Sequence, residues 1–331
     1  MAADNTSPDS SVQRQSPSGT VGGMVAQASS SRSFRFSDVE PYIFLLPFLL
    51  TFLAFMIGPF IWMLYMSLTD WVGILDPEFV GLANYDRMFF KDNVFWRAFL
   101  NNIWFAVGAV LLVIPFAMGI ALILNWQALP AKPIFRTLFF LPIATSAAVV
   151  SVIFANIFGR EYGIVNFIFG NFGIGVIDWF SDPVAIKPAI MTLIVWRWSA
   201  LFMIYLLAGL QGISNEYYEA AKVDGANAFH SFLNVTIPLL RPVLVFVLVI
   251  VTHDSLRVFE EPFILTRFTS EGDAAAGGPE DSALTLSLYL YRHGFLWGKL
   301  GYGSAVSFFI FALTMIVAFI QIKRLRGLFA H

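Results

Sequence analysis

The sequence predicts an all-α membrane protein with six membrane-spanning helices, and three observations lead to that prediction. Of the 331 residues, 58% are apolar and only 13% are charged, whereas soluble domains carry about 25% charged residues. Six apolar segments each run roughly 20 residues or more, enough to cross a bilayer at a rise of about 1.5 Å per residue. A polar stretch that is rich in helix-cap and turn residues separates the fourth of these segments from the fifth.

The start of the chain has a different composition from the rest. Residues 1–37 hold ten serines and almost no large apolar side chains before Phe34. Such a segment cannot bury enough apolar surface to fold, so we expect a disordered cytoplasmic tail. The first apolar run starts too late and is too long for a signal peptide. Residues 38–326 are then predicted to form the membrane domain, with its core at 98–323.

The six apolar segments differ in their polar content. The first is free of charge, the third has Arg136 near its start, the fourth contains Arg197, and the fifth contains His253 and Asp254. Pro59, Pro115 and Pro142, inside or near the ends of spans, are interpreted as ordinary kinks, which membrane helices tolerate. The predicted spans lie at about 41–69, 99–124, 134–158, 188–210, 239–259 and 301–322.

Basic residues at span ends predict the orientation. An even number of spans places both termini on one side. The turn after the second span holds Lys132 and Arg136 without an acidic residue, and the sixth span ends in Lys323, Arg324 and Arg326. Short basic turns favour the cytoplasmic side. We therefore expect a multi-pass protein of the cytoplasmic membrane, with both termini and the loop at 214–238 in the cytoplasm.

The loop at 214–238 combines a helix, a stop and a second helix. Ser214 or Asn215 caps a helix start, and Glu216 and Glu219 suit the positive end of its dipole. Gly225 is a natural helix stop because it adopts a left-handed conformation without steric cost.

The second half of the loop continues this design. Phe229, Phe232 and Leu233 fall on one face of a second short helix, and Pro238 and Pro242 suit the start of the next span. The small side chains of Ala220 and Ala221 in the first helix let a partner surface approach closely. The sequence therefore predicts a small rigid knuckle for docking rather than a plain solvated loop.

This loop resembles the cytoplasmic EAA loop of the permease subunits of ABC importers, which reads E-A-A-x-x-D-G-A followed by F, an aliphatic residue, P and P. The residues in register are Glu219, Ala220, Ala221, Asp224, Gly225, Ala226, Phe232, Val235, Pro238 and Pro242. The resemblance runs from about residue 41 to 326 and implies the type I importer permease fold with a coupling helix. The pattern at 67–71 and 79–85 is similar to the carbohydrate-uptake branch, of maltose and glycerol-3-phosphate type, and to its first permease.

Two departures from the family pattern stand out. Ser214-Asn215 replaces the proline that usually precedes the EAA helix, although this pair still provides a cap. The last outer loop usually holds a short T-x-G-G-P turn, whereas residues 269–279 are longer and acidic. The second departure puts in question how this loop meets an extracellular partner.

The resemblance also implies a division of labour among subunits. The chain has no G-x-x-x-x-G-K phosphate loop, so ATP and Mg²⁺ are expected on two separate ATPase subunits. Glu219 would meet basic groups there and Gly225 would hold the turn. A second homologous permease and an extracytoplasmic solute-binding protein complete the expected assembly. A net charge of −2 gives no sign of a nucleic-acid partner.

Two polar groups within spans are candidates for the substrate pathway. Arg197 lies between Trp196 and Trp198. A charge inside a membrane span costs free energy, so it needs a role or a partner. Arg197 therefore suits either a sugar or anion site or an interhelical contact. For His253-Asp254, the family resemblance implies a polar patch lining the pathway. The pair also leaves open a proton-coupled carrier or a membrane enzyme that uses it as acid and base. The chain has no cysteine, and no His, Asp or Glu set has metal-ligand spacing.

Overall fold

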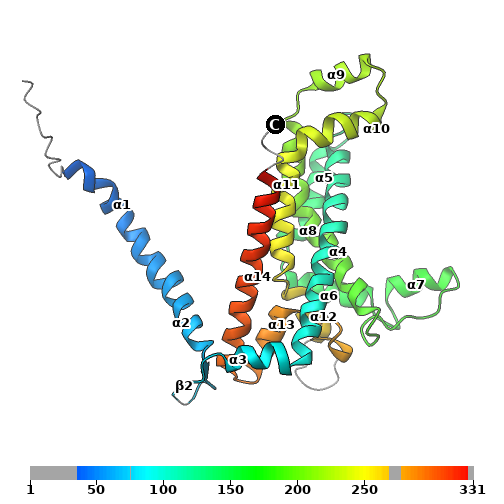
Figure 1. Cartoon of the computed structure of the whole chain (residues 1–331). Helices are drawn as coiled ribbons and strands as arrows, with labels where there is room; N and C mark the ends of the chain where they lie inside the picture. The colour runs from blue at the N-terminus through cyan, green and yellow to red at the C-terminus, as the bar shows by residue number, and fades with distance from the viewer. Residues whose placement is uncertain (1–35, 75, 268–276, 327–331) are drawn as a thin grey trace, which may run out of the picture. The chain divides into compact units, whose positions relative to one another are not determined.

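The computed structural model describes residues 36–74, 76–267 and 277–326 (Figure 1). The described chain is mainly helical, and its strands are the short antiparallel pair β1 (Thr69–Asp70) and β2 (Glu78–Phe79). This confirms the all-α membrane class. The predicted tail lies outside the described residues except for Phe36 and Ser37, which belong to the first helix, so helical structure begins two residues earlier than expected.

The chain divides into two units at Leu53. The described part of the first unit is α1 (Phe36–Phe52), and the second unit begins within a π-helical turn, η1 (Leu53–Ile57), before α2 (Gly58–Met66). Residues Ile43–Met66 form a continuous apolar stretch of 24 residues, long enough to span a membrane. This matches the expected first span at 41–69.

Four longer helices of the second unit also qualify as membrane spans, and each contains or closely overlaps a predicted one. They are α4 (Asn93–Asn125), α8 (Ile186–Gln211), α11 (Ile237–Ser255), which extends a helical run from Ala228, and α14 (Leu300–Arg326). The main core lies among α4, α6, α8 and α11. On α4 the buried residues Ala109, Val113, Ala117 and Ala121 recur every four positions. Such small side chains let α8 pack closely, as is typical of membrane helices.

The third predicted span is not one continuous helix, so the expectation of a simple kink there was wrong. The chain forms α5 (Lys132–Ala144) and α6 (Ala147–Ile157), which are bent by 100° relative to each other. Pro142 cannot donate a backbone hydrogen bond, and Thr145 and Ser146 adopt extended conformations with ψ of 145° and 134°. Because two extended residues redirect the chain, the described residues hold five helices long and apolar enough to cross a membrane plus this bent pair, and the six-span count stays a prediction.

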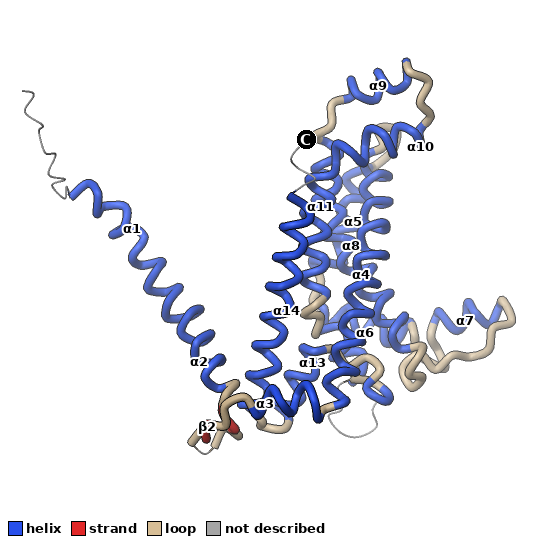
Figure 2. The backbone as a smooth tube through the Cα atoms, viewed as in Figure 1, coloured by secondary structure: helices blue, strands red, loops and turns tan. Residues whose placement is uncertain are grey.

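Shorter elements gather at the two ends of the helical bundle (Figure 2). At one end lie α9 (Asn215–Val223), α10 (Ala228–Ser231) and η3 (Phe232–Thr236). Toward the other end lie the remaining short elements, which are α3 (Ala83–Asp86), η2 (Arg87–Lys91), α7 (Ile164–Asn171), α12 (Glu260–Arg267), η4 (Pro279–Asp281), α13 (Leu286–Tyr291) and η5 (Arg292–Leu296).

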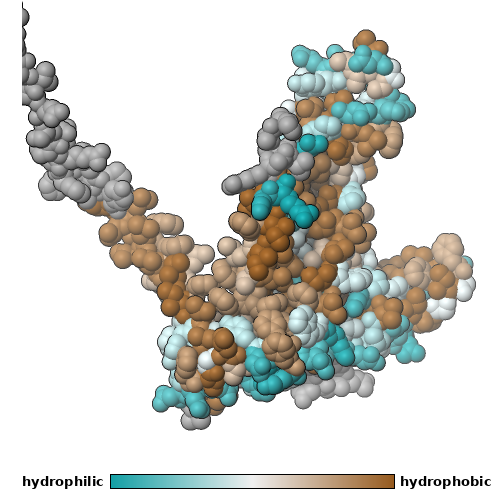
Figure 3. Space-filling view, in the orientation of Figure 1, coloured by the Kyte–Doolittle hydropathy of each residue, from teal (hydrophilic) through white to brown (hydrophobic). Residues whose placement is uncertain are grey.

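The surface of the second unit is banded in the way a membrane protein requires (Figure 3). Hydrophobic side chains cover the flanks of the long helices, and hydrophilic residues gather over α9 and α10 and at the opposite end. Exposed apolar residues such as Leu111, Leu112 and Ile316 contribute to the flanks. Large exposed apolar surfaces mark contact with lipid or partners, so this band identifies the bilayer-facing zone.

Candidate functional site

The segment Ser214–Pro238, here called the coupling segment, forms α9, a turn, α10 and η3 at one end of the bundle (Figure 1). The Oγ of Ser214 accepts a hydrogen bond from the backbone N–H of Glu216 at 3.3 Å, so Ser214 is the N-cap of α9. The expected cap is therefore present without the family's proline. Glu216 lies in the first turn of α9, where an acidic side chain stabilises the helix dipole.

Gly225 ends α9 as the sequence predicts. Its φ is +81°, a left-handed conformation that residues with a Cβ adopt only at a cost. The N–H of Gly225 donates to the carbonyl of Lys222 at 3.0 Å, and the N–H of Ala226 donates to that of Ala221 at 2.8 Å. These two bonds make a Schellman motif, which satisfies the last carbonyls of α9 and fixes the direction of the turn.

The second helix of the coupling segment is continuous with the next span. The Oδ1 of Asn227 accepts from the N–H of His230 at 2.9 Å and caps α10. The chain then passes through the π-helical turn η3 into α11, with Pro238 in the first turn of α11 and Pro242 inside it. The π-helical turn η3 comes just before Pro238, which has no backbone N–H to donate to a preceding carbonyl. The coupling segment is thereby joined rigidly to the membrane helix α11.

The inner face of the coupling segment packs onto the bundle. The hydroxyls of Tyr218 on α9 and Thr236 on η3 lie 3.1 Å apart, and Phe232 packs against the main core. A cavity of about 560 Å³ separates this face from the end of α4, with Trp126 and Ala226 in its wall. The segment is therefore supported from behind, with space beneath it.

The outer face of the coupling segment is exposed. Glu219, Ala220, Asp224 and Gly225 are exposed, and α9 contains no buried residue. The side chain of Val223 is 88% exposed. Within the part of the chain that the structure describes, the carboxylate of Glu219 has no hydrogen bond or ion pair. A capped helix that presents apolar and acidic side chains outward is a surface suited to a protein partner.

Arg197 is paired with acidic residues of another helix. Its Nη1 lies 2.9 Å from Oε1 of Glu261 and 3.7 Å from Oε2 of Glu260, both in α12. The Nε1 of Trp198 donates to the same Glu261 oxygen at 3.0 Å. Glu261 is only 2% exposed, so this contact matches the interhelical interpretation of Arg197 and ties α12 to α8.

Trp196 faces a different neighbourhood from Arg197 and Trp198. Its ring lies 5.4 Å from that of Phe154 on α6, and it lines a mostly apolar cavity of about 480 Å³ together with Trp104 and Met191. The structure therefore does not assemble the three consecutive residues into one binding site.

His253 and Asp254 lie in the last turn of α11, which ends at Ser255 rather than at 259 as expected. The His253 Nδ1 and the Asp254 Oδ1 are 3.3 Å apart, and both side chains are partly exposed. His253 lines a cavity of about 200 Å³ with Thr314 and Gln321. Asp254 is not among the residues that line this cavity.

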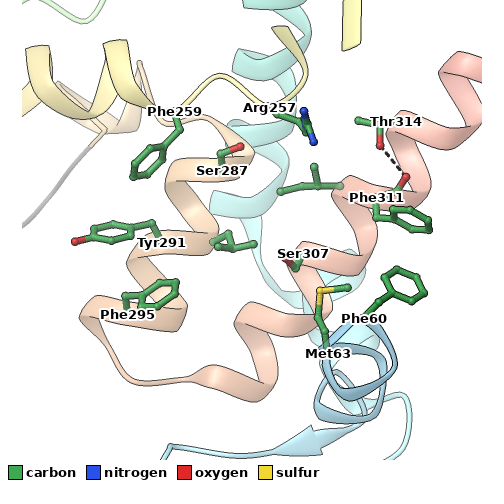
Figure 4. A pocket seen from close by; sticks show the side chains of 12 residues that line it. Phe60, Met63, Arg257, Phe259, Ser287, Tyr291, Phe295, Ser307, Phe311 and Thr314 are labelled. Atoms are coloured by element: carbon green, nitrogen blue, oxygen red, sulfur yellow. Dashed lines mark hydrogen bonds between the residues drawn. The ribbon is translucent and has the colours of Figure 1, made fainter. Parts of the chain in front are cut away.

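A larger cavity of about 510 Å³ lies between α2, α13, η5, α14 and the turn after α11 (Figure 4). Arg257 reaches into this cavity, and the hydroxyl residues Ser287, Ser307 and Thr314 contribute to its wall. Among the described residues, no carboxylate lies within ion-pair distance of its guanidinium. The aromatic residues that line the cavity are Phe60, Phe259, Tyr291, Phe295 and Phe311.

A buried polar cluster joins the start of α4 to α13 and α14. The Oδ2 of Asp92 accepts from the hydroxyls of Tyr289 at 2.5 Å and Tyr302 at 3.0 Å, while its Oδ1 caps α4. The ring of His293 lies 4.4 Å from that of Tyr289. These contacts fasten three elements at the end of the bundle that is opposite the coupling segment.

Burial and hydrogen bonding shift the titration of this cluster. Burial by itself raises the pKa of Asp92, but hydrogen bonds from Tyr289, the Phe95 N–H and Tyr302 outweigh it and hold the pKa below its usual value. Burial lowers the pKa of His293 to about 4 and raises that of Tyr289 well above its usual range. The folded cluster therefore holds a carboxylate and a neutral imidazole at neutral pH.

Sequence reasoning missed Arg257, Glu261 and Asp92. A sequence signal existed for Arg257, because it lies inside the fifth predicted span (239–259), where a charged residue is costly and often functional. Glu261 could be identified only as a possible partner for Arg197, and nothing in its spacing favours it over Glu260. The Asp92 cluster joins residues about 200 positions apart, so no local pattern indicates it. The expectation for residues 269–279 falls largely outside the described residues.

The long apolar helices and their exposed apolar flanks define a multi-pass membrane protein, and comparison with known proteins specifies the family. No family model matches the chain. It is 34% identical over 302 residues to the arabinooligosaccharides transport system permease AraP of Bacillus subtilis, covering 90% of this chain and 92% of that protein. It is 35% identical over 300 residues to the lactose transport system permease LacF of Rhizobium radiobacter, covering 90% and 97%.

A third relative extends the comparison to archaea. The chain is 32% identical over 288 residues to the trehalose/maltose transport system permease MalF of Thermococcus litoralis, covering 86% of this chain and 94% of that protein. The chain belongs to the family of ABC sugar transport system permeases. This confirms the family that the loop motif indicates.

The fold agrees with this assignment. A chain of a bacterial ABC transporter involved in the import of the acidic polysaccharide alginate superposes with a TM-score of 0.75 at 22% identity. The match covers 88% of this chain and 98% of that one. A second structure, of the alginate transporter in complex with its oligosaccharide-bound periplasmic protein, also gives a TM-score of 0.75, at 21% identity.

Proposed function

We propose that this chain is the membrane-spanning subunit of an ATP-driven importer that carries a mono- or oligosaccharide into the cytoplasm. The names of its relatives AraP, LacF and MalF support a sugar as substrate. In this proposal ATP and Mg²⁺ bind to two separate ATPase subunits. A second homologous permease completes the pathway, and a solute-binding protein outside the membrane delivers the sugar, as the complex with a periplasmic protein suggests.

The observation that carries this proposal is the exposed outer face of the coupling segment. Its backbone is fixed by a Ser214 cap, a Schellman turn at Gly225 and a continuous helix into α11. Its outward side chains, including Glu219 and Val223, have no cover in the described chain. Such a rigid projection transmits movement well, because it cannot deform independently of the span that carries it.

The mechanism we propose is alternating access. When ATP closes the ATPase dimer, the docked coupling segment moves with it, and α11 moves because it is one helical run with α10. The spans then pass from an inward-open to an outward-open state. Glu219 pairs with basic groups of the ATPase, and the small Ala220 and Ala221 admit close approach. The coupling segment and both termini lie on the cytoplasmic side of the cytoplasmic membrane.

The substrate pathway is proposed to include the cavity around Arg257 and the neighbouring His253-Asp254 patch. A volume of about 510 Å³ falls in the range of about 300–1,000 Å³ that is typical of small-molecule sites. Its aromatic rings suit stacking on the apolar faces of a sugar, and its guanidinium and hydroxyls suit the sugar oxygens. Arg197 has a smaller part here, because Glu261 already engages its guanidinium.

The coupling proposal is tested with paired variants of the coupling segment. We expect the double variant Glu219→Lys/Gly225→Val to lose assembly with co-expressed ATPase subunits, or to assemble without sugar-dependent ATP hydrolysis and uptake. Glu216→Gln is the matched control, because Glu216 is also an exposed acid of α9 but lies outside the motif. Normal assembly and uptake in the double variant, measured in reconstituted vesicles, would show that the segment is not the ATPase contact.

A further inference from the structure

The segment between α6 and α8 contains a long apolar stretch without charge. Residues 162–177 include no Asp, Glu, Lys or Arg, and α7 forms the first half of this stretch. The side chains of Phe167 and Phe172 are 74% and 78% exposed. The exposed apolar residues of this outer face are Ile164, Phe167, Ile168, Phe172 and Val176.

The inner side of α7 is firmly fixed to the bundle. The Asn166 amide donates to the carbonyls of Arg160 at 3.1 Å and Ile177 at 2.8 Å, and its Oδ1 accepts from Nε1 of Trp179 at 3.1 Å. Phe169 packs against Trp179, with ring centroids 5.8 Å apart. Because Asn166 and Phe169 hold this side, the opposite side of α7 is presented outward in a defined orientation.

The outer side of α7 is therefore mainly apolar, whereas its inner side is held by the buried amide of Asn166 together with Phe169. An apolar helix face needs cover by protein or by lipid, and the outer side of α7 has no protein cover in the described chain. The exposed bulky side chains of this outer face form a patch that a soluble surface rarely carries.

The position of α7 indicates what covers this patch. α7 leaves the bundle sideways, toward the end opposite α9 and α10 (Figure 1). Its hydrophobic surface continues onto the flank of the bundle (Figure 3). The neighbouring helix α6 also exposes apolar residues, namely Val149, Val152 and Ile153. The outer face of α7 is thus an extension of a surface that already meets lipid.

We propose that α7 and residues 172–176 lie in the interfacial layer of the bilayer, with Phe167 and Phe172 inserted among the lipid chains. Lipid fits this surface better than a protein partner does, because residues 162–177 carry no charged side chain that could pair with a partner. Exposed Tyr162 precedes α7, and aromatic residues of this kind favour the membrane–water boundary. The exposed ion pair of Arg160 with Asp178, at 3.1 Å, lies beside the patch and suits the headgroup region.

The absence of cysteine from the chain makes the test direct. Phe167→Cys and Phe172→Cys are each labelled with a nitroxide, and the full chain is reconstituted in phosphatidylethanolamine–phosphatidylglycerol vesicles. Collision of the label with oxygen, which concentrates in lipid, is compared with collision with a water-soluble nickel chelate. Val149→Cys on α6 is the lipid control, and Val223→Cys on α9 is the water control.

We expect the oxygen-to-nickel collision ratio at both phenylalanine positions to be several-fold higher than at Val223 and to approach that at Val149. A ratio equal to that at Val223 would mean that the face meets water, and low collision with both reagents would mean that protein covers it. Either result would overturn the proposal. Phe172 lies outside α7, so its variant gives an independent reading if Phe167→Cys folds poorly.

Discussion

Replacing Glu261 with alanine removes the carboxylate that holds both Arg197 and Trp198. The carboxylate is almost fully buried, and the Arg197 side chain is only 16% exposed. Its loss leaves a buried guanidinium and an indole N–H without their acceptor, since only Glu260, at 3.7 Å, remains near the charge. Breaking a buried ion pair from one side costs about 3–5 kcal/mol, and we expect a loss of this size.

A double-mutant cycle measures this cost. In detergent-solubilised protein, Glu261→Ala should lower the apparent melting temperature by roughly 5–15 °C, at a few degrees per kcal/mol. The apolar pair Arg197→Met/Glu261→Leu should recover most of that loss, because exchanging a whole buried pair for apolar side chains is often neutral or stabilising. Arg160→Met is the control, since it breaks an exposed ion pair that is worth about 0–1 kcal/mol.

The reasoning fails if Glu261→Ala lowers the melting temperature no more than Arg160→Met does. It also fails if the effects of the single changes Arg197→Met and Glu261→Leu simply add in the double variant, because groups in direct contact should be coupled. Either outcome would mean that Arg197 is not held by Glu261 in the folded protein, and would return it to the candidates for substrate contact.

Three further predictions follow from other parts of the structure. Gly225→Ala should weaken ATPase coupling, measured as sugar-dependent ATP hydrolysis and uptake, because an alanine in the left-handed conformation costs about 1–2 kcal/mol. This cost is conformational, since no atom lies near the new Cβ. Gly225→Asn should retain more activity in the same measurements, because asparagine tolerates this conformation. Neutral His293 contributes fully to the free energy of unfolding above about pH 6.5, and this contribution is lost as the pH falls toward 4. The loss amounts to about 3 kcal/mol. The melting temperature of His293→Asn should therefore fall less than that of the wild type between pH 6.5 and pH 4. Arg257→Gln should reduce sugar uptake in vesicles while assembly with the ATPase subunits persists, and equal uptake would remove Arg257 from the pathway.

Much of the architecture could be predicted because membrane helices leave a strong local signal. Long apolar runs predicted the helices now seen as α4, α8, α11 and α14. The caps and turn of the coupling segment could be located because Ser214, Gly225 and Pro238 each have a specific backbone effect. Such signals depend only on near neighbours in the chain.

Features that depend on distant residues could not be predicted in the same way. Pro142 signalled a disturbance, but a 100° bend needs two extended residues, and Thr145 and Ser146 have no sequence pattern that requires this. The partner of Arg197 lies 64 positions away, and Asp92 meets Tyr302 across 210 positions. Packing of the whole bundle decides those pairs, and a single sequence does not record it.

The central claim is that the coupling segment contacts a separate ATPase subunit. Ala220→Cys places a single thiol on the exposed face of α9 in a chain without native cysteine, and this thiol can carry a short photoactivated crosslinker in the assembled transporter. We predict crosslinking of this position to an ATPase subunit, with a yield that changes when ATP is added, whereas a crosslinker at Phe167→Cys gives no such product. If the crosslinker at Ala220→Cys reacts only with lipid or is quenched by water, in a complex that contains the ATPase and hydrolyses ATP, the claim is contradicted.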